Sequence, residues 1–559
     1  MKYRDGFRDM KISPRSYFYL LIFSVVCFGI VVPGAINILL SQYLSGPVAY
    51  VVYLVPLFIV FVVGMLPLIS SSQRKIKVDR IFPLYITELA ALSTSEMSID
   101  RIFNIISEKK IYGPLADDSR RMYRLIKHYN VSAAEACRFV AVRTPSVQEA
   151  DFFNRLGHAL EIGETMSRFM YNEHDVIMSE YVLRSESSLK DLDFVKEVYT
   201  GMVTSMIFIC VFISIIPLLG TMDIDIILLS IVLGFAIMEG TFIYYIGTKV
   251  PRDNIWLGWR NKSRSGYFTD LDRTLIISIV VAVLGVVILF LLLLPLNLPP
   301  LLLVSSTFLP ILIPGFLITR EERRIEKRDN IYGAFIRSLG RSSSVAGITM
   351  VEAVKKLAMH KFGPLTAMVQ NLSKRLRMHI DPKISWKHFS SESSSHLIDR
   401  FGDMYTECAL NGSKPDETSL FISDNMFKIL SIRKKRTIIA SNFFGVLYGV
   451  MISLAFTLWI TIGITQYMGD VMGGIKIADE GVMDEGFLST ILNSDFDIGP
   501  LRLMAFGVIL VHAFFSSLML PLMRGGHIMS AAIHLISLLW MAALAEYLVE
   551  LLLNGLLNA

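Results

Sequence analysis

The sequence has few charged residues and few cysteines for its length. Charged residues make up 18% of the 559 residues, whereas a typical soluble protein has about 25%. The four cysteines, Cys27, Cys137, Cys210 and Cys408, show no CxxC or Cys/His spacing. This pattern argues against a disulfide framework and against a cysteine-ligated zinc site, so we expect no metal and no cofactor.

The sequence also lacks the motifs of common catalytic sites. It contains no GxxxxGK[ST] loop to hold phosphates, no HExxH, no GxSxG and no kinase signature. The ten histidines are scattered along the chain. We therefore predict that the protein is not an enzyme and has no catalytic, cofactor-binding or metal-binding residue. Any energy for work must come from a partner or from an ion gradient.

Long apolar runs are abundant. Hydrophobic residues make up 53% of the chain and the mean hydropathy is +0.53. Several runs reach the roughly 18 residues that mark a membrane-spanning helix. They predict an all-α polytopic membrane protein with about nine spans. The predicted spans are 17–40, 48–70, 201–219, 225–247, 274–295, 298–318, 441–464, 501–522 and 529–553.

Two long polar stretches interrupt these spans, and β-branched alternation of the strand type is scarce in them. We predict two helical-bundle domains in a parallel repeat. The predicted segments are 1–70 (N-terminal tail and spans one and two), 71–200 (first helical domain), 201–318 (spans three to six with a short basic loop), 319–440 (second helical domain) and 441–559 (spans seven to nine with an acidic loop).

Charge is distributed unequally over the connections between spans. The N-terminal tail and the loop between spans four and five are basic, whereas the connection 466–500 contains seven acidic residues and one lysine. Basic loops favour the cytoplasmic side of a membrane. We therefore predict a cell-membrane protein with a cytoplasmic N-terminus, two cytoplasmic helical domains, and a C-terminus outside the cell.

Short motifs mark helix ends in both polar stretches. Ser132, Ser146 and Thr349 are each followed three residues later by glutamate, the pattern of a capping box at a helix start. Gly113-Pro114-Leu115 predicts a helix stop. Gly363-Pro364-Leu365 repeats it in the second stretch, and Arg400-Phe401-Gly402 repeats Arg155-Leu156-Gly157 at a similar separation.

Basic clusters stand where the polar stretches meet the spans. Lipid anchoring and topology explain such clusters without any partner. The alternative is that they dock an acidic or nucleotide-driven cytoplasmic protein. Nucleic acid is not expected, because aromatic stacking platforms are absent from the clusters. The residues are Arg74, Lys75, Lys77, Arg320, Arg323, Arg324, Lys327, Arg328, Arg433, Lys434, Lys435 and Arg436.

Glu239 is the ionisable residue that stands out within a predicted span. A charge at that depth costs about 2–3 kcal/mol or more. Glu239 could therefore contact another span or a translocating substrate. The simpler interpretation is a glutamate packed beside Gly240 and paired with a buried donor. His512 and His534 are expected to be packed interhelical residues.

The architecture resembles the platform proteins of type II secretion and type IV pili, which carry a duplicated F domain. It is most similar to the archaeal branch, and within it to archaellum platforms. The motifs that carry the likeness are short: Gly347-Ile-Thr-Met-Val-Glu-Ala353 with Gly363-Pro364-Leu365, and Met97-Ser-Ile-Asp-Arg101 with Gly113-Pro114-Leu115. The likeness covers essentially the whole chain.

The resemblance implies a mechanical role. It implies a hexameric secretion ATPase bound on the cytoplasmic side, archaellin or pilin subunits in the membrane, other motor-complex proteins, and a homodimer. An adhesion-pilus or type II secretion platform is an alternative. From other classes, a transporter component energised by a separate ATPase and a membrane receptor or scaffold also remain open.

Overall fold

The computed structural model describes residues 78–215 without residue 80, 224–250, 255–257, 270–296, 298–478 and 498–557. The first two predicted spans, 17–40 and 48–70, lie outside these residues. All regular structure in the described ranges is helical, apart from an isolated β-bridge between Trp256 and Ser395. The all-α prediction is confirmed. The chain divides into two compact units.

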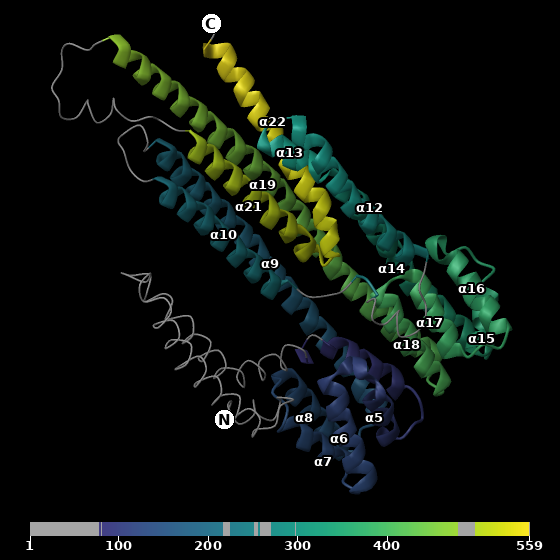
Figure 1. Ribbon diagram of the computed structural model, residues 1–559. Helices are drawn as coiled ribbons and strands as arrows, with labels where there is room; N and C mark the ends of the chain where they lie inside the picture. The colour runs from purple at the N-terminus through teal and green to yellow at the C-terminus, as the bar shows by residue number, and fades with distance from the viewer. Residues whose placement is uncertain are drawn as a thin grey trace, which may run out of the picture. The chain divides into compact units, whose positions relative to one another are not determined.

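The first unit extends to Met178 and also includes Leu410–Lys414. Its described part is a helical bundle (Figure 1). The elements are the helix Ile81–Ser93, α5 (Ile99–Glu108), η2 (Lys110–Tyr112), α6 (Pro114–His128), α7 (Ala133–Ala141), α8 (Val147–Glu161) and the start of α9 (Met166–Ile215). Their amphipathic faces bury large side chains such as Phe82, Phe103 and Phe152, which explains why these polar sequences fold as a bundle.

The second unit contains the remaining spans and the second helical domain. The spans lie in α9, α10 (Ile224–Lys249), α12 (Asp270–Leu293), α13 (Pro300–Thr307) with α14 (Leu312–Ala346), α19 (Pro415–Ala478), α21 (Gly499–Arg524) and α22 (Ala531–Leu557). The domain comprises the end of α14, α15 (Met350–Leu357), η6 (Gly363–Leu365), α16 (Thr366–Arg377), α17 (Pro382–Ser393), α18 (His396–Leu410) and the start of α19.

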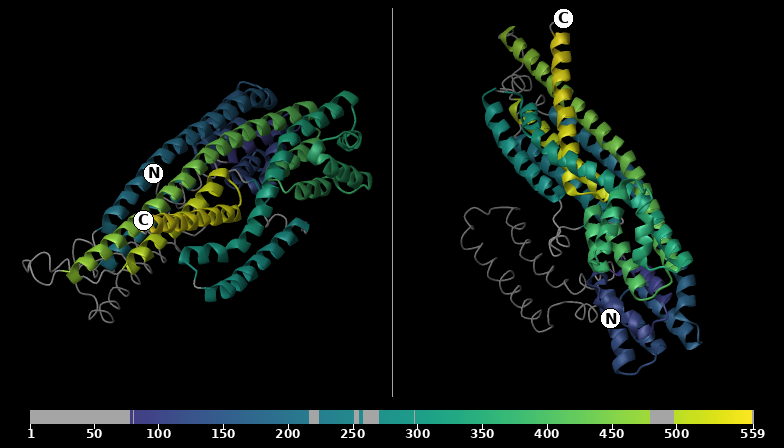
Figure 2. Two further views of the ribbon diagram at one scale, coloured as in Figure 1. Left: turned by 90° about the horizontal axis from the view of Figure 1, so that it is seen from above. Right: turned by 90° about the vertical axis from the view of Figure 1, so that its right-hand side faces the viewer.

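Seven helices in the described residues are long and apolar enough to cross a membrane. They coincide with the last seven predicted spans. Helix α10 packs on α21, and α19 packs on α14, α21 and α22 (Figures 1 and 2). A shared apolar core, which includes Val203, Phe235 and Val508, joins α9, α10, α13, α19, α21 and α22. Helix α12 is the least buried of the seven.

Three helices run without a break from a span into a polar domain. Helix α9 has 50 residues, α14 has 35 and α19 has 64. At 1.5 Å per residue, α19 is about 95 Å long, roughly three times the thickness of the hydrocarbon core. The predicted segment limits at 200, 318 and 440 therefore fall inside continuous helices. Hydropathy detects where a helix enters lipid, but it does not detect where the helix ends.

The predicted helix starts are confirmed as N-caps. The side chains of Ser132, Ser146 and Thr349 each accept a hydrogen bond from the backbone N–H three residues later. The Gly-Pro motif does more than the predicted stop, because Gly113 ends η2 while Pro114 begins α6. Gly113 and Gly363 have φ values of 51° and 54°, which glycine adopts without steric cost. This shared geometry supports a structural repeat.

Candidate functional site at the junction of domain and spans

The predicted basic residues divide into an outward and an inward group. Arg74, Lys75 and Lys77 lie outside the described residues. The exposed ones form what we call the basic face: Arg320, Arg323, Arg324 and Lys327 of α14, with Lys434 and Lys435 of α19. Arg328, Arg433 and Arg436 are buried or half-buried. The α14 positions follow an i, i+3, i+4, i+7 spacing, which places them on one side of the helix.

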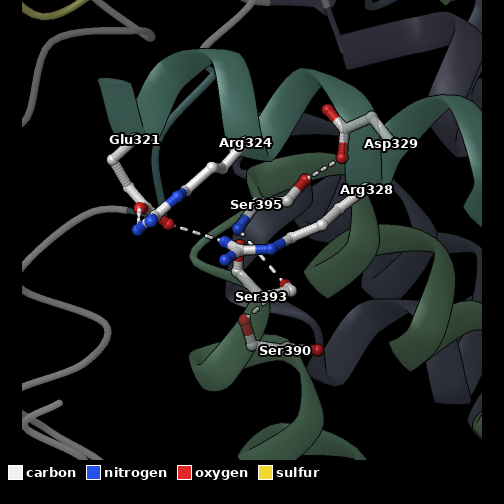
Figure 3. A network of polar contacts seen from close by, with 7 residues as sticks. All are labelled: Glu321, Arg324, Arg328, Asp329, Ser390, Ser393 and Ser395. Carbon is white, nitrogen blue, oxygen red and sulfur yellow. Dashed lines mark hydrogen bonds and ion pairs between the residues drawn. The ribbon is translucent and has the colours of Figure 1, made fainter. Parts of the chain in front are cut away.

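Arg328 ties α14 to the end of α17. Its Nη1 atom lies 2.7 Å from Oε1 of Glu321 and donates to the carbonyl oxygen of Ser393 at 2.9 Å. Figure 3 shows the guanidinium of Arg328 between these two groups. Arg324 also reaches Glu321, at 3.1 Å, but its side chain is half exposed. Arg328 therefore serves the fold, whereas Arg324 remains accessible.

Asp329 is the buried centre of this region. Its side chain is fully buried, accepts the hydroxyl of Ser395 and lies 2.7 Å from Nη1 of Arg433 on α19 (Figure 3 shows the serine contact). Ser395 also caps α18 by accepting the N–H of Ile398 at 3.2 Å. One carboxylate thus joins α14, α18 and α19. A buried charge is tolerated when it is paired and hydrogen-bonded in this way.

A short extended segment fastens the loop between α10 and α12 to the same place. Leu257 N donates to Ser394 O at 2.9 Å, and His396 N donates to Ile255 O at 3.1 Å. These two bonds flank the β-bridge of Trp256 with Ser395. The segment 255–257 therefore acts as a strap across the start of α18.

Glu322 connects this strap to the turn between α21 and α22. Its Oε1 atom accepts the indole N–H of Trp256 at 3.0 Å and the backbone N–H of His527 at 2.6 Å. Burial lowers the pKa of His527, although Glu322 opposes this effect. We call the whole set, formed by Trp256, Glu321, Glu322, Arg328, Asp329, Ser393–Ser395, Arg433 and His527, the junction.

The remaining basic residues of α19, Lys434, Lys435 and Arg436, lie in three different environments. Lys435 forms an ion pair with Glu186 of α9, and both side chains are partly exposed. Arg436 is buried against Gly525, where an added Cβ would lie 2.7 Å from its Nη2 atom. Gly525 has φ +70°, so glycine suits this position both in backbone conformation and in space. Lys434 is exposed.

Glu239, the intramembrane candidate, is fully buried between spans. It accepts a hydrogen bond from the Tyr199 hydroxyl at 2.9 Å and lies 2.8 Å from Nδ1 of His512. A Cβ on the neighbouring Gly240 would meet the ring of Phe515 at 3.7 Å. The glutamate is thus paired within the protein, and His512 is packed between helices.

Sequence reasoning missed the acidic half of the junction. Glu321, Glu322 and Asp329 are surrounded by arginine and lysine in the sequence, which drew attention to the positive charge alone. A signal was present: Asp79 precedes Gly113 by 34 residues (113 − 79), and Asp329 precedes Gly363 by the same 34 (363 − 329). The repeat therefore places an aspartate at equivalent positions in both domains.

The fold and the junction define a class of protein. It is a multi-pass membrane protein with a duplicated helical domain whose end helices continue into the membrane. The family model of the type II secretion system protein F matches residues 85–214 and 335–463, one match in each half. The starts of these matches have the same separation as Gly113 and Gly363.

Relatives of known name narrow this class. The chain is 31% identical to flagella accessory protein J of Methanocaldococcus jannaschii over 557 residues, covering 98% of this chain and 97% of the relative. It is 30% identical to flagella accessory protein J of Methanococcus voltae, covering 98% of each. An uncharacterized protein of M. jannaschii is 21% identical over 72% of this chain and 71% of its own length. The chain belongs to the type II secretion protein F family and, within it, to the flagella accessory protein J group. No solved structure matches.

Proposed function

We propose that this protein is the membrane platform of an archaeal type IV pilus-like machine, the archaellum. It couples a cytoplasmic secretion ATPase to the assembly of filament subunits and to rotation of the filament. Family membership and the end-to-end likeness to two flagella accessory proteins support the platform role. An adhesion-pilus or secretion platform is the second candidate, because the F domain model itself carries a secretion name.

The observation that carries the coupling is the continuity of helices between the domains and the spans. Helices α14 and α19 each contain both a span and a part of the second domain. Residues of the junction fix these two helices to one another next to the basic face. A force applied to the second domain would therefore reach the spans without passing through a flexible loop. The basic face is the proposed docking surface for the ATPase, since it combines accessible positive charge with this rigid support.

Charge reversal of the basic face tests the docking. We would replace Arg323, Arg324, Lys434 and Lys435 together by glutamate in the full chain. Binding of the secretion ATPase of the same organism should fall at least about tenfold in a pull-down, because charged groups at an interface rim govern encounter and specificity. Membrane insertion should persist, since these side chains face solvent.

A matched variant controls for net charge. Lys355, Lys356, Lys374 and Arg377 are also exposed on the second domain but lie outside the basic face. Reversing these four changes the net charge equally and should leave ATPase binding intact. Equal loss in both variants, or no loss in the first, would contradict docking at the basic face.

A deletion strain tests the platform role itself. We expect cells without the gene to lack archaella and to stop swimming, with both restored by the wild-type gene. Loss of adhesive pili with normal swimming would favour the adhesion-pilus platform. Normal filaments together with a defect in solute uptake would favour a transporter.

A further inference from the structure

Three spans meet at a cluster of polar side chains within the membrane part of the chain. Tyr199 comes from α9, Glu239 from α10, and His512 and Ser516 from α21. All four side chains are fully buried. The Tyr199 hydroxyl also lies 3.2 Å from the Ser516 hydroxyl, which is 3.4 Å from Nδ1 of His512. These contacts therefore link α9, α10 and α21 through one continuous cluster.

The two carboxylate oxygen atoms of Glu239 differ in their hydrogen bonds. Both Tyr199 and His512 contact the same oxygen of Glu239, Oε1. Among the described residues, Oε2 of Glu239 and Nε2 of His512 have no hydrogen-bond partner. Burying a polar atom without a partner costs free energy. The cluster thus offers two unfilled positions where a further proton can be held.

Aromatic rings surround Tyr199 and His512, so the net charge of the Glu239–His512 pair determines how costly its burial is. The ring of Phe235 lies 6.0 Å from that of His512, and the rings of Phe242 and Phe443 lie 5.1 and 5.4 Å from that of Tyr199. The facing titratable groups are Tyr199 of α9, Glu239 of α10 and His512 of α21, while α19 contributes the Phe443 ring. Among the described residues, no lysine, arginine or second carboxylate forms an ion pair with Glu239 or His512.

Three protonation states of the Glu239–His512 pair can be compared. A carboxylate with a neutral imidazole carries one net negative charge in an apolar site, which is costly. One additional proton, on the imidazole or on the carboxyl group, makes the pair neutral overall. A second additional proton would make it positive. The neutral state of the pair is therefore favoured over both the negative state and the positive state.

We propose that Glu239 and His512 form an intramembrane proton-binding site that holds one exchangeable proton between them and thereby locks α9, α10 and α21 together. Loss of the proton leaves an uncompensated negative charge that weakens the packing of the three spans. The site is independent of the proposed docking of an ATPase, because it involves neither the basic face nor the junction.

Stability as a function of pH tests this site in the full-length protein in lipid nanodiscs. Wild type, E239Q and H512Q would be compared from roughly pH 4 to roughly pH 9, a range that includes the ordinary pKa values of both side-chain types. Gain or loss of one proton changes the folded-to-unfolded ratio by up to about tenfold per pH unit. We expect wild type to lose stability toward the alkaline end relative to E239Q, because the unfolded chain releases the shared proton there and the folded pair holds it. Toward the acid end E239Q should lose more stability than wild type, because its buried imidazole then faces protonation without a carboxylate beside it.

His534 supplies the control, since it is another histidine between spans. Its Nδ1 lies 3.1 Å from the Tyr448 hydroxyl, and no carboxylate of the described residues forms an ion pair with it. H534Q should keep the wild-type loss of stability toward alkaline pH, because that loss depends on the carboxylate of Glu239. Should E239Q fail to fold, infrared spectra of wild type and H512Q would report carboxyl protonation directly, and a pH dependence altered by H512Q supports the shared proton. Parallel stability profiles of wild type and E239Q, or identical carboxyl titrations in wild type and H512Q, would overturn the proposal.

Discussion

The hydroxyl of Ser395 donates to the buried carboxylate of Asp329, 66 residues earlier in the chain. The first domain repeats this relationship, since Ser146 donates to Asp79 at 2.5 Å. In both domains the serine is also the N-cap of the helix that follows it. The repeat therefore preserves a specific polar contact between a domain's entry helix and one of its later helices, as well as the helix order.

Removal of the Asp329 carboxylate should strongly destabilise the second unit. D329N deprives Arg433 of its ion-pair partner, and the Arg433 side chain is only 11% exposed. Breaking a buried pair costs about 3–5 kcal/mol. The check is thermal unfolding of the purified protein. D424N, which breaks a partly exposed pair with Lys428 within one turn of the same α19 helix, should cost less, about 0.5 kcal/mol.

An alanine at position 340 should push α14 away from α19. A Cβ there would lie 2.1 Å from Oγ of Ser419 and 2.4 Å from the carbonyl oxygen of Pro415. Overpacking of this kind costs about 1–3 kcal/mol or more. G449A, at a helical position with no atom within 4 Å of the new Cβ, should be neutral or slightly stabilising because alanine favours helix. Equal unfolding temperatures for both variants would refute this close approach of the helices.

Acidification should weaken the turn at His527. Burial lowers the pKa of this imidazole, and its Nδ1 accepts the N–H of Met529 at 3.3 Å, which the protonated ring could no longer do. A histidine with a depressed pKa costs stability as the pH falls below its unfolded value of about 6.5, since the unfolded chain then binds more protons. H527N keeps an acceptor for the N–H and should remove this part of the pH dependence. H360N, at an exposed histidine, should leave the pH profile of unfolding unchanged.

The sequence was sufficient to predict the helical class, the last seven spans and the helix starts, because each depends on local chemistry. Hydropathy identifies spans, and a serine three residues before a glutamate identifies a cap. The junction depends on contacts between residues far apart in sequence. Nothing local in Glu322 shows that it will accept hydrogen bonds from Trp256 and His527.

The basic face could be predicted in part from the sequence. The spacing of Arg320, Arg323, Arg324 and Lys327 shows that they share one side of a helix. Arg328 follows Arg324 by four residues, so spacing alone does not separate this half-buried arginine from the exposed ones. That Arg433 and Arg436 face inward while Lys434 and Lys435 face outward could not be predicted without knowing which side of α19 packs against α14 and α21. The packing of α19 against these helices determines which of the four side chains are buried.

The ion pair between Lys435 and Glu186 should contribute little to stability. Their side chains are 53% and 33% exposed, and exposed pairs contribute about 0.2–1 kcal/mol. K435E should therefore lower the unfolding temperature only slightly, and the exchange K435E/E186K should restore it. Restored stability without restored ATPase binding would assign Lys435 to the docking surface, because E186K returns the charge pair but leaves a glutamate in the basic face. A large loss of stability in K435E alone would instead mean that the pair holds α9 to α19, and binding assays with that variant would then report on folding.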